Sequence, residues 1–192
     1  MAQKKTLLDS NAYFRRAYNI HPLLFVEFGN DKYCLYIIDD LMDEFKNSPR
    51  LKNKFDWVKE KAFAENRSHP VDINSKQKKE ISDALSYIWG MSREIGVSFV
   101  DVKAVATALT VKVKLVSDDC GVQEISKTYE VDCISSLALL KLMLDSRHID
   151  MEKVRQTVAY WQFNKDIPKN FKQDYKKLFG ENPPSLDYNG EL

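Results

Sequence analysis

The sequence contains few of the residues that indicate a bound cofactor, a disulfide scaffold or a membrane segment. Its 192 residues include only three cysteines and six unclustered glycines, and the net charge is +1. An odd cysteine number without Cys-x-x-Cys spacing argues against a disulfide framework and a zinc knuckle. Scattered glycines exclude a glycine-rich phosphate loop. No apolar run approaches the roughly 18 residues of a membrane helix, and the polar start MAQKK lacks a signal-peptide core. We therefore expect a soluble, cytoplasmic protein without membrane contact.

The cysteines and histidines do not form a metal-binding pattern. The histidines stand far apart, with no His-x-x-x-His spacing and no cysteine partner for zinc. The cysteines lie in apolar or strand-like surroundings, where we expect buried thiols. These six residues are Cys34, Cys120, Cys133, His21, His69 and His148.

What the sequence does have is a regular alternation of predicted strands and helices. With 44% hydrophobic residues, the chain can bury one good core. Alternation of this kind predicts a mostly parallel sheet, joined by right-handed crossovers and flanked by helices in three layers. The predicted strands are residues 4–8, 32–38, 111–116 and 131–135.

The stretch from Ser98 to Asp119 is the centre of this pattern. Valines and alanines recur near the helical period through residue 111, and the run VKVKLV then alternates as in a strand. Asp119 lies where that strand would end. The carboxyl ends of strands in an α/β sheet are where ligands bind, so Asp101 and Asp119 are candidate site residues.

Four acids occupy predicted strand ends or helix starts in four separate segments: Asp9, Glu44, Asp101 and Asp119. A parallel sheet would bring them to one edge, where their mutual repulsion calls for a cation. Oxygen ligands without histidine or cysteine favour magnesium or manganese, and such a site activates water in phosphoryl transfer.

Each of these acids also has a purely structural interpretation. Asp9 is a good helix cap, and Ser98 with Asp101 fits a capping box. Asp118 or Asp119 could cap the helix that follows, and Asp118 competes with Asp119 for the fourth position. The acidic window 39–44 suits a helix N-terminus, and both Asp40 and Asp43 compete there with Glu44.

Two other phosphotransfer classes do not fit the sequence. The segment Asp9–Asn11 lacks the second aspartate of a haloacid-dehalogenase phosphatase. A receiver domain would need a lysine after its last strand, and VDCISS offers none.

Basic residues concentrate just after the acidic first segment. Residues 49–80 carry nine lysines and arginines against five acids. A solvated helix face explains such a run, but cations beside an acidic cleft would also hold a polyanion. The candidates for backbone contacts are Arg50, Lys52, Lys54 and Lys76.

The pattern changes after residue 146. We divide the chain into a domain of residues 1–146 and a helical extension of residues 147–192, which contains two predicted helices separated by Pro168. Its aromatic residues suggest core packing first, and otherwise a base-stacking surface, an oligomer contact or an antitoxin groove. They are Tyr160, Trp161, Phe163, Phe171, Tyr175 and Phe179.

Across roughly residues 4–146 the chain resembles the PIN-domain nucleases. The motifs, in the order and approximate spacing of that family, are LLDSNAYFRRA, IIDDLMDEFKNSPRL, SFVDVKAVATAL and KLVSDDCGV. The resemblance implies a three-layer PIN-like fold whose quartet of acids binds magnesium or manganese. Carried over by position, these acids are Asp9, Glu44, Asp101 and Asp119, with Asn11 and Ser117 in supporting places.

The resemblance also implies a function. We expect a divalent-metal-dependent endoribonuclease that leaves a 5′-phosphate and a 3′-hydroxyl. Compact members of the family are toxins of toxin–antitoxin pairs, which implies an antitoxin partner and a homodimer. The two C-terminal helices exceed those compact members. Alternatives are a non-catalytic PIN-like scaffold that binds RNA or protein, and a DNA-directed nuclease.

Overall fold

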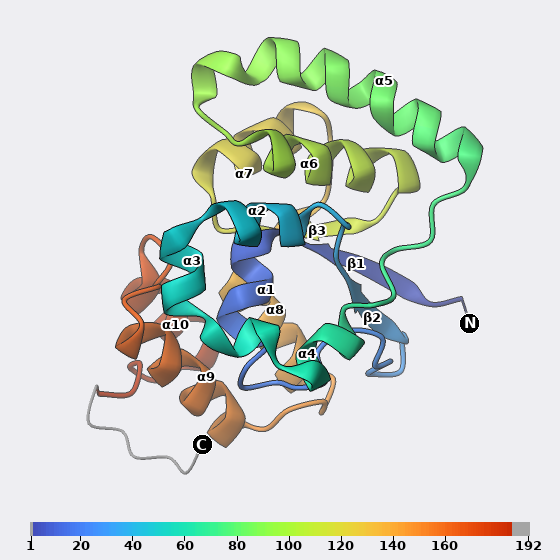
Figure 1. The fold of residues 1–192 in the computed structure, drawn as a ribbon. Helices are drawn as coiled ribbons and strands as arrows, with labels where there is room; N and C mark the ends of the chain where they lie inside the picture. The colour runs from blue at the N-terminus through green and yellow to red at the C-terminus, as the bar shows by residue number, and fades with distance from the viewer. Residues whose placement is uncertain (1, 186–192) are drawn as a thin grey trace.

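A parallel four-stranded sheet forms the middle of the molecule (Figure 1). The computed structural model describes residues 2–185. The strand order is β2-β1-β3-β4, and every pairing is parallel. The predicted α/β class, with a mostly parallel sheet flanked by helices, is therefore confirmed. The strands are β1 (Lys4–Leu8), β2 (Tyr33–Tyr36), β3 (Lys114–Val116) and β4 (Cys133–Ile134).

Strand β1 pairs on both edges and therefore lies at the centre. Its register joins Leu7 to both Tyr36 and Leu115. A parallel strand covered on both faces is expected to be apolar throughout its buried part, and Leu7 and Leu8 are both fully buried. Since all strands run the same way, their carboxyl ends share one edge of the sheet.

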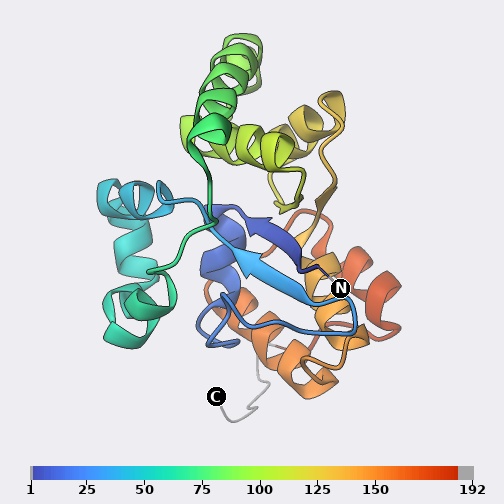
Figure 2. The ribbon, with the colours of Figure 1, turned by 90° about the vertical axis from the view of Figure 1, so that its right-hand side faces the viewer.

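Helices cover both faces of the sheet, as Figure 2 shows in side view. Successive residues of β1 point to opposite faces, so Leu8 joins one hydrophobic core and Leu7 the other. On the Leu8 side lie α1 (Ser10–Arg16), α8 (Ser136–Asp145), α9 (Met151–Phe163) and α10 (Phe171–Phe179). On the Leu7 side lie α5 (Ser75–Ser92), α6 (Phe99–Val111) and α7 (Cys120–Thr128), with the short 3-10 helix η2 (Arg93–Ile95) between α5 and α6.

Four short helices follow β2 and pack against α1. Phe45 and Phe55 bury their rings against Phe14, with ring centroids 5.7 and 5.2 Å away. These helices therefore extend the Leu8-side core beyond the carboxyl edge of the sheet. They are α2 (Leu41–Asn47), α3 (Pro49–Lys54), η1 (Asp56–Lys59) and α4 (Lys61–Asn66).

The predicted strand at residues 111–116 is wrong in its first half. Helix α6 continues through Val111, and Lys112 ends it in a left-handed conformation with φ of 55°. A left-handed residue lets its N–H bond back to the Ala108 carbonyl, and the strand then begins at Lys114. Alternation of valine and lysine alone could not locate this turn.

One expected buried thiol is exposed. Cys34 is buried and Cys133 is half-buried, but Cys120 lies exposed at the first position of α7. The first residue of α7 lies on the solvent side of that helix, while Val122 and Ile125 provide its buried side. No helix within residues 2–185 is both long and apolar enough to cross a bilayer.

The two C-terminal helices share the Leu8-side core. Val158, Trp161 and Tyr175 are fully buried there, and the Trp161 indole N–H donates to the Arg15 carbonyl of α1. Core packing thus explains most of the C-terminal aromatic residues, although the Phe163 side chain is 79% exposed. Residues 186–192 of the predicted extension lie outside the described part of the chain.

Trp161→Ala should therefore destabilise the whole protein. Removing a buried indole leaves a cavity, and we expect a loss of about 3–5 kcal/mol in the free energy of unfolding, measured by denaturant titration. The control Phe163→Ala, on the same helix but exposed, should change it by less than about 0.5 kcal/mol. A loss below about 1 kcal/mol for Trp161→Ala would show that α9 is not part of the cooperative core.

Candidate carboxylate site

Asp9 connects the end of β1 to the start of α1. Its backbone N–H donates to the Val116 carbonyl of β3 at 3.1 Å, which holds it at the carboxyl edge of the sheet. Its Oδ1 accepts the Ala12 N–H at 2.6 Å and caps α1. Its Oδ2 is buried and has no hydrogen-bond partner among the described residues. Burial raises the pKa of Asp9 to about 7, against the lowering effect of hydrogen bonds from Ser117 and Ala12.

Asp101 lies in the first turn of α6, where Ser98 is the cap. The Asp101 N–H donates to Ser98 Oγ at 3.1 Å, and this hydroxyl donates to Asp101 Oδ2 at 2.8 Å. The carboxylate thus accepts from the Ser98 hydroxyl. Burial, together with the negative charges of Glu44 and Asp119, raises the pKa of Asp101 to about 6, against the lowering effect of hydrogen bonding to Ser98.

Glu44 and Asp119 complete the set from two other segments. Glu44 is half-buried on α2, and its Oε2 is buried without a hydrogen-bond partner among the described residues. Asp119 follows β3 and is exposed. Its Oδ1 caps α7 by accepting the N–H groups of Gly121 at 2.8 Å and Val122 at 3.0 Å. Its Oδ2 takes no part in that cap.

Asp101 connects the four carboxylates electrostatically. The charges of Asp101 and of the neighbouring Asp118 raise the pKa of Asp9, after the larger effect of burial. Glu44 and Asp119 act on Asp101 in the same direction. Asp101 is therefore the member that couples to all three others. Within residues 2–185, none of the four forms an ion pair with a lysine, arginine or histidine.

The structure distinguishes these acids from their neighbours in the sequence. Asp40 pairs with Lys103 of α6 at 2.7 Å. Asp43 is exposed and pairs with Lys46 at 3.3 Å. These contacts neutralise the two competitors of Glu44.

Asp118, the competitor of Asp119, is buried in a structural network. Its Oδ2 pairs with the Arg15 guanidinium, and its Oδ1 accepts the Ser136 N–H at 2.8 Å. Arg15 also bonds Asp166 through the Asp166 carbonyl and carboxylate. Asp118 therefore connects three parts of the chain and has no oxygen left for a ligand.

The four carboxylates offer the oxygen donors that a hard cation prefers, but their side chains are not arranged to bind one together. Among residues 2–185 no three acidic, histidine or cysteine side chains stand together as a ready metal centre. Asp9 and Asp119 each commit one oxygen to a helix cap, and Asp101 bonds Ser98. The donors are all oxygens, and buried oxygens of Asp9 and Glu44 lack partners, as magnesium or manganese ligands would before binding. Shared coordination requires carboxylates to turn from these positions.

The two predicted supporting residues lie beside Asp9. Ser117 is fully buried, its Oγ accepts the Asp119 N–H at 3.2 Å, and its hydroxyl lowers the pKa of Asp9. Ser117 therefore bonds the backbone of the fourth acid and influences the first. Asn11 is half-buried in the first turn of α1.

The predicted basic residues do not form one surface. Arg50 is exposed and Lys52 half-buried on α3, whereas Lys54 pairs with Asp166 at 3.3 Å. Lys76 lies at the start of α5, and Figures 1 and 2 both show α5 well apart from α3. Only the α3 residues are near α2, which carries Glu44.

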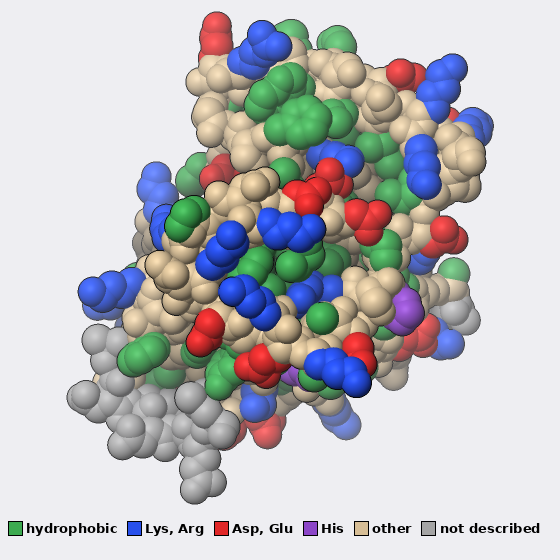
Figure 3. All heavy atoms as spheres, viewed as in Figure 1, with side chains coloured by type: hydrophobic (Ala, Val, Ile, Leu, Met, Phe, Trp, Pro, Cys, Tyr) green, Lys and Arg blue, Asp and Glu red, His purple; other side chains and the backbone are tan. Residues whose placement is uncertain are grey.

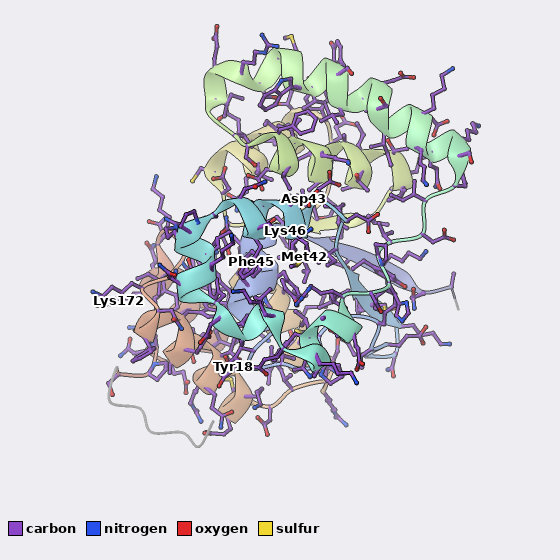
Figure 4. All side chains as sticks on the ribbon, in the orientation of Figure 1. Tyr18, Met42, Asp43, Phe45, Lys46 and Lys172 are labelled. Atoms are coloured by element: carbon purple, nitrogen blue, oxygen red, sulfur yellow. The ribbon has the colours of Figure 1, made fainter. Side chains whose placement is uncertain are left out.

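Lysine and arginine side chains nevertheless gather over α2–α4 in the view of Figure 3, with Asp and Glu side chains directly beside them. Figure 4 labels Lys46 and Asp43 on α2 in this region, while Lys172 projects from α10 at the outer side of the molecule. The Lys46 side chain is 66% exposed. A basic surface therefore adjoins the acidic one.

Sequence reasoning did not single out Lys103, Arg15 or Arg16. The Arg16 side chain is fully buried; its Nε and Nη2 have no partner among the described residues, and its guanidinium lies 5.6 Å from the Trp161 ring centroid. Burial lowers the pKa of Arg16 to about 10, and the charges of Asp118 and Asp9 oppose that effect. From the sequence, two arginines in the last turn of a helix suggest only a favourable interaction with the helix dipole, so the burial of Arg16 was not predicted.

No known protein-family model matches the chain, and a search of curated proteins found no match.

Asp101→Asn should stabilise the protein in a pH-dependent way. The pKa of Asp101 is raised from 3.8 to about 6, so the unfolded chain releases its proton at lower pH and stability falls as the pH rises through this window. At pH 7.5 the free energy of unfolding of the variant should be about 1–3 kcal/mol larger than that of the wild type, and this difference should become smaller toward pH 4. Denaturant titrations at both pH values measure this. An equal increase in the free energy of unfolding at both pH values, or a decrease, would contradict the raised pKa of Asp101.

Asp118→Asn should have the opposite effect. It removes the buried partner of Arg15, which keeps only Asp166, and we expect a loss of about 2–4 kcal/mol at pH 7.5. The same titration measures it, with Asp43→Asn as an exposed control that should stay near the wild type. A stabilised Asp118→Asn variant would place Asp118 in the repulsive set.

Proposed function

We propose that the chain is a divalent-metal-dependent endoribonuclease with a PIN-like fold. The observation that carries the proposal is the arrangement of Asp9, Glu44, Asp101 and Asp119. They come from four segments, and Asp101 interacts electrostatically with each of the other three. None of the four forms an ion pair within residues 2–185, although the charges of Arg15 and Arg16 act on Asp9 from beyond ion-pair distance, whereas each competing acid has an ion pair. Natural proteins tolerate such repulsion mainly where function requires it.

Magnesium or manganese would be held by these four carboxylates. Asp9 and Glu44 offer oxygens that lack hydrogen bonds, and Asp119 offers the oxygen that its cap leaves unused. When bound, such an ion stabilises charge on a phosphoryl group and activates water. Ser117 would keep the start of α7 in place through its hydrogen bond from the Asp119 N–H.

The substrate would be RNA, held by its phosphates on the basic surface over α2–α4. Arg50 and Lys52 have no acidic partner among the described residues and would make salt-sensitive backbone contacts, and Lys46 would join them by exchanging its exposed pair with Asp43 for a phosphate. In the reaction, a water oxygen bonds to phosphorus as the P–O3′ bond breaks. The products are a 5′-phosphate and, after protonation, a 3′-hydroxyl. The quartet would repel the scissile phosphate until a cation neutralises it, whereas contacts of the RNA with the basic surface do not need the cation.

The PIN-like assignment rests on order and topology. The first acid follows the central strand β1, the fourth follows β3, and the four motifs occur in the family's order. By the same resemblance we propose a cytoplasmic toxin with an antitoxin partner and a homodimeric state. DNA instead of RNA as the substrate is a variant of this proposal.

A second candidate is a non-catalytic scaffold that binds RNA or protein. The observation in its favour is that Asp9 and Asp119 already serve as helix caps, while no three acids of residues 2–185 meet as a metal centre. In that case the same side chains would have only structural roles.

Cleavage of a mixed structured RNA by the purified protein in manganese distinguishes the two. We expect cutting that EDTA stops, and that Asp101→Asn or Asp119→Asn reduces at least about 100-fold, because each removes a negative ligand. Asp43→Asn, on the same surface but paired with Lys46, should cut like the wild type. Folded wild-type protein that cuts neither RNA nor DNA would favour the scaffold.

A further inference from the structure

A small pocket lies between α5, α6 and the segment that follows β2. Its volume is about 300 Å³, the lower end of the range for small-molecule sites. Its floor is apolar, with Val71 and Ile81 buried and Leu85 half-buried. Its rim is polar and includes Asp39 and Ser82. A pocket of this size and lining suits one flat, amphipathic group.

The pocket and the candidate site use the same two helices, although none of the four acids lines the pocket. Asp40 and Lys103 both line it, and their 2.7 Å ion pair connects the start of α2 to α6. Glu44 lies one turn beyond Asp40, since its N–H donates to the Asp40 carbonyl at 3.3 Å. Asp101 lies two residues before Lys103 on α6. The same two helices therefore carry the pocket wall and two of the four acids (Figure 1).

The charged groups at the rim differ in their availability. Asp39 is exposed and has no hydrogen bond or ion pair with other described residues, so its carboxylate is free to accept hydrogen bonds from a ligand. Lys78 is also exposed at the rim and pairs with no acid among residues 2–185. A donor-bearing ring with a phosphate attached would match a free carboxylate and a free ammonium group.

We propose that this pocket binds one unpaired nucleobase of the substrate and prefers adenine or cytosine to uracil; this rests on the proposed function. Val71, Ile81 and Leu85 would contact the ring face. Asp39 would accept a hydrogen bond from the exocyclic amino group, which adenine and cytosine present where uracil has a carbonyl oxygen. Lys78 would contact a neighbouring phosphate. A base inside a duplex could not enter, so the pocket selects single-stranded RNA.

Binding without cleavage tests the inference. Fluorescence anisotropy in EDTA would compare a labelled oligouridylate with the same oligomer carrying one central adenosine or cytidine. The wild type should bind either substituted oligomer at least about 5-fold more tightly, the lower bound for a base-specific hydrogen-bonded contact. Ser82→Trp, which fills the pocket from an exposed helix position, and Asp39→Ala should both remove this preference.

Two matched controls separate the pocket from the surface around it. Ser86→Trp adds the same indole one turn along α5, at an exposed position outside the pocket. Asp43→Ala removes a charge from an exposed acid that does not line it. Both should keep the preference. Equal binding of all three oligomers by the wild type, or loss of the preference in the controls as well, would overturn the inference.

Cleavage of the same oligomers in manganese shows which proposal fails. Metal-dependent cutting without any base preference, unchanged by Ser82→Trp, would leave the nuclease proposal in place and refute the pocket. A preference that depends on Ser82 and Asp39, without cutting by folded protein, would refute the nuclease and keep the pocket as a base-binding site.

Discussion

The carboxyl edge of the parallel sheet is where the acidic residues of this protein interact. Because β1 and β3 are neighbours, Asp9 and Asp119 both follow strands that end at this edge. Helices α2 and α6 add Glu44 and Asp101, and the charge of Asp101 acts on Asp9. Burial raises the pKa of Asp9 and Asp101, because water stabilises their charged forms less well there.

The surroundings of this site are held by opposite charges. Asp118 pairs with Arg15, and Asp40 with Lys103, each across segments far apart in the chain. These pairs hold α1, α2 and α6 in place around the quartet without neutralising it. Fixed ion pairs beside unpaired acids are what a preorganised site needs, because the support must not change when a ligand binds.

Asp9 shows how structure and site can depend on one residue. One of its oxygens caps α1, and the other is buried without a partner. The helix cap therefore positions the carboxylate. Both interpretations of Asp9 from the sequence, as a cap and as a site residue, are compatible with this geometry, because the cap uses only one of the two oxygens.

Local sequence patterns were sufficient for some elements and insufficient for others. The apolar run before Asp9 and the alternation of strands and helices predict the parallel sheet, because burial on both faces selects such runs. Asp40 pairs with Lys103, which is 63 residues away from it in the sequence, and this pair is the reason for preferring Glu44. Asp118 pairs with Arg15, which is 103 residues away from it, and this pair is the reason for preferring Asp119. No local pattern contains such pairings. For the same reason the end of α6 at Lys112 and the burial of Trp161 beside Arg15 came only with the structure.

Calorimetric titration of the protein with manganese tests whether the quartet is one site whose repulsion a cation relieves. We expect saturable binding to the wild type and to Asp43→Asn. Binding should be at least about 10-fold weaker in Asp101→Asn, which removes the charge coupled to the other three. No saturable binding to folded wild-type protein, or equal affinity in Asp101→Asn, would contradict this expectation.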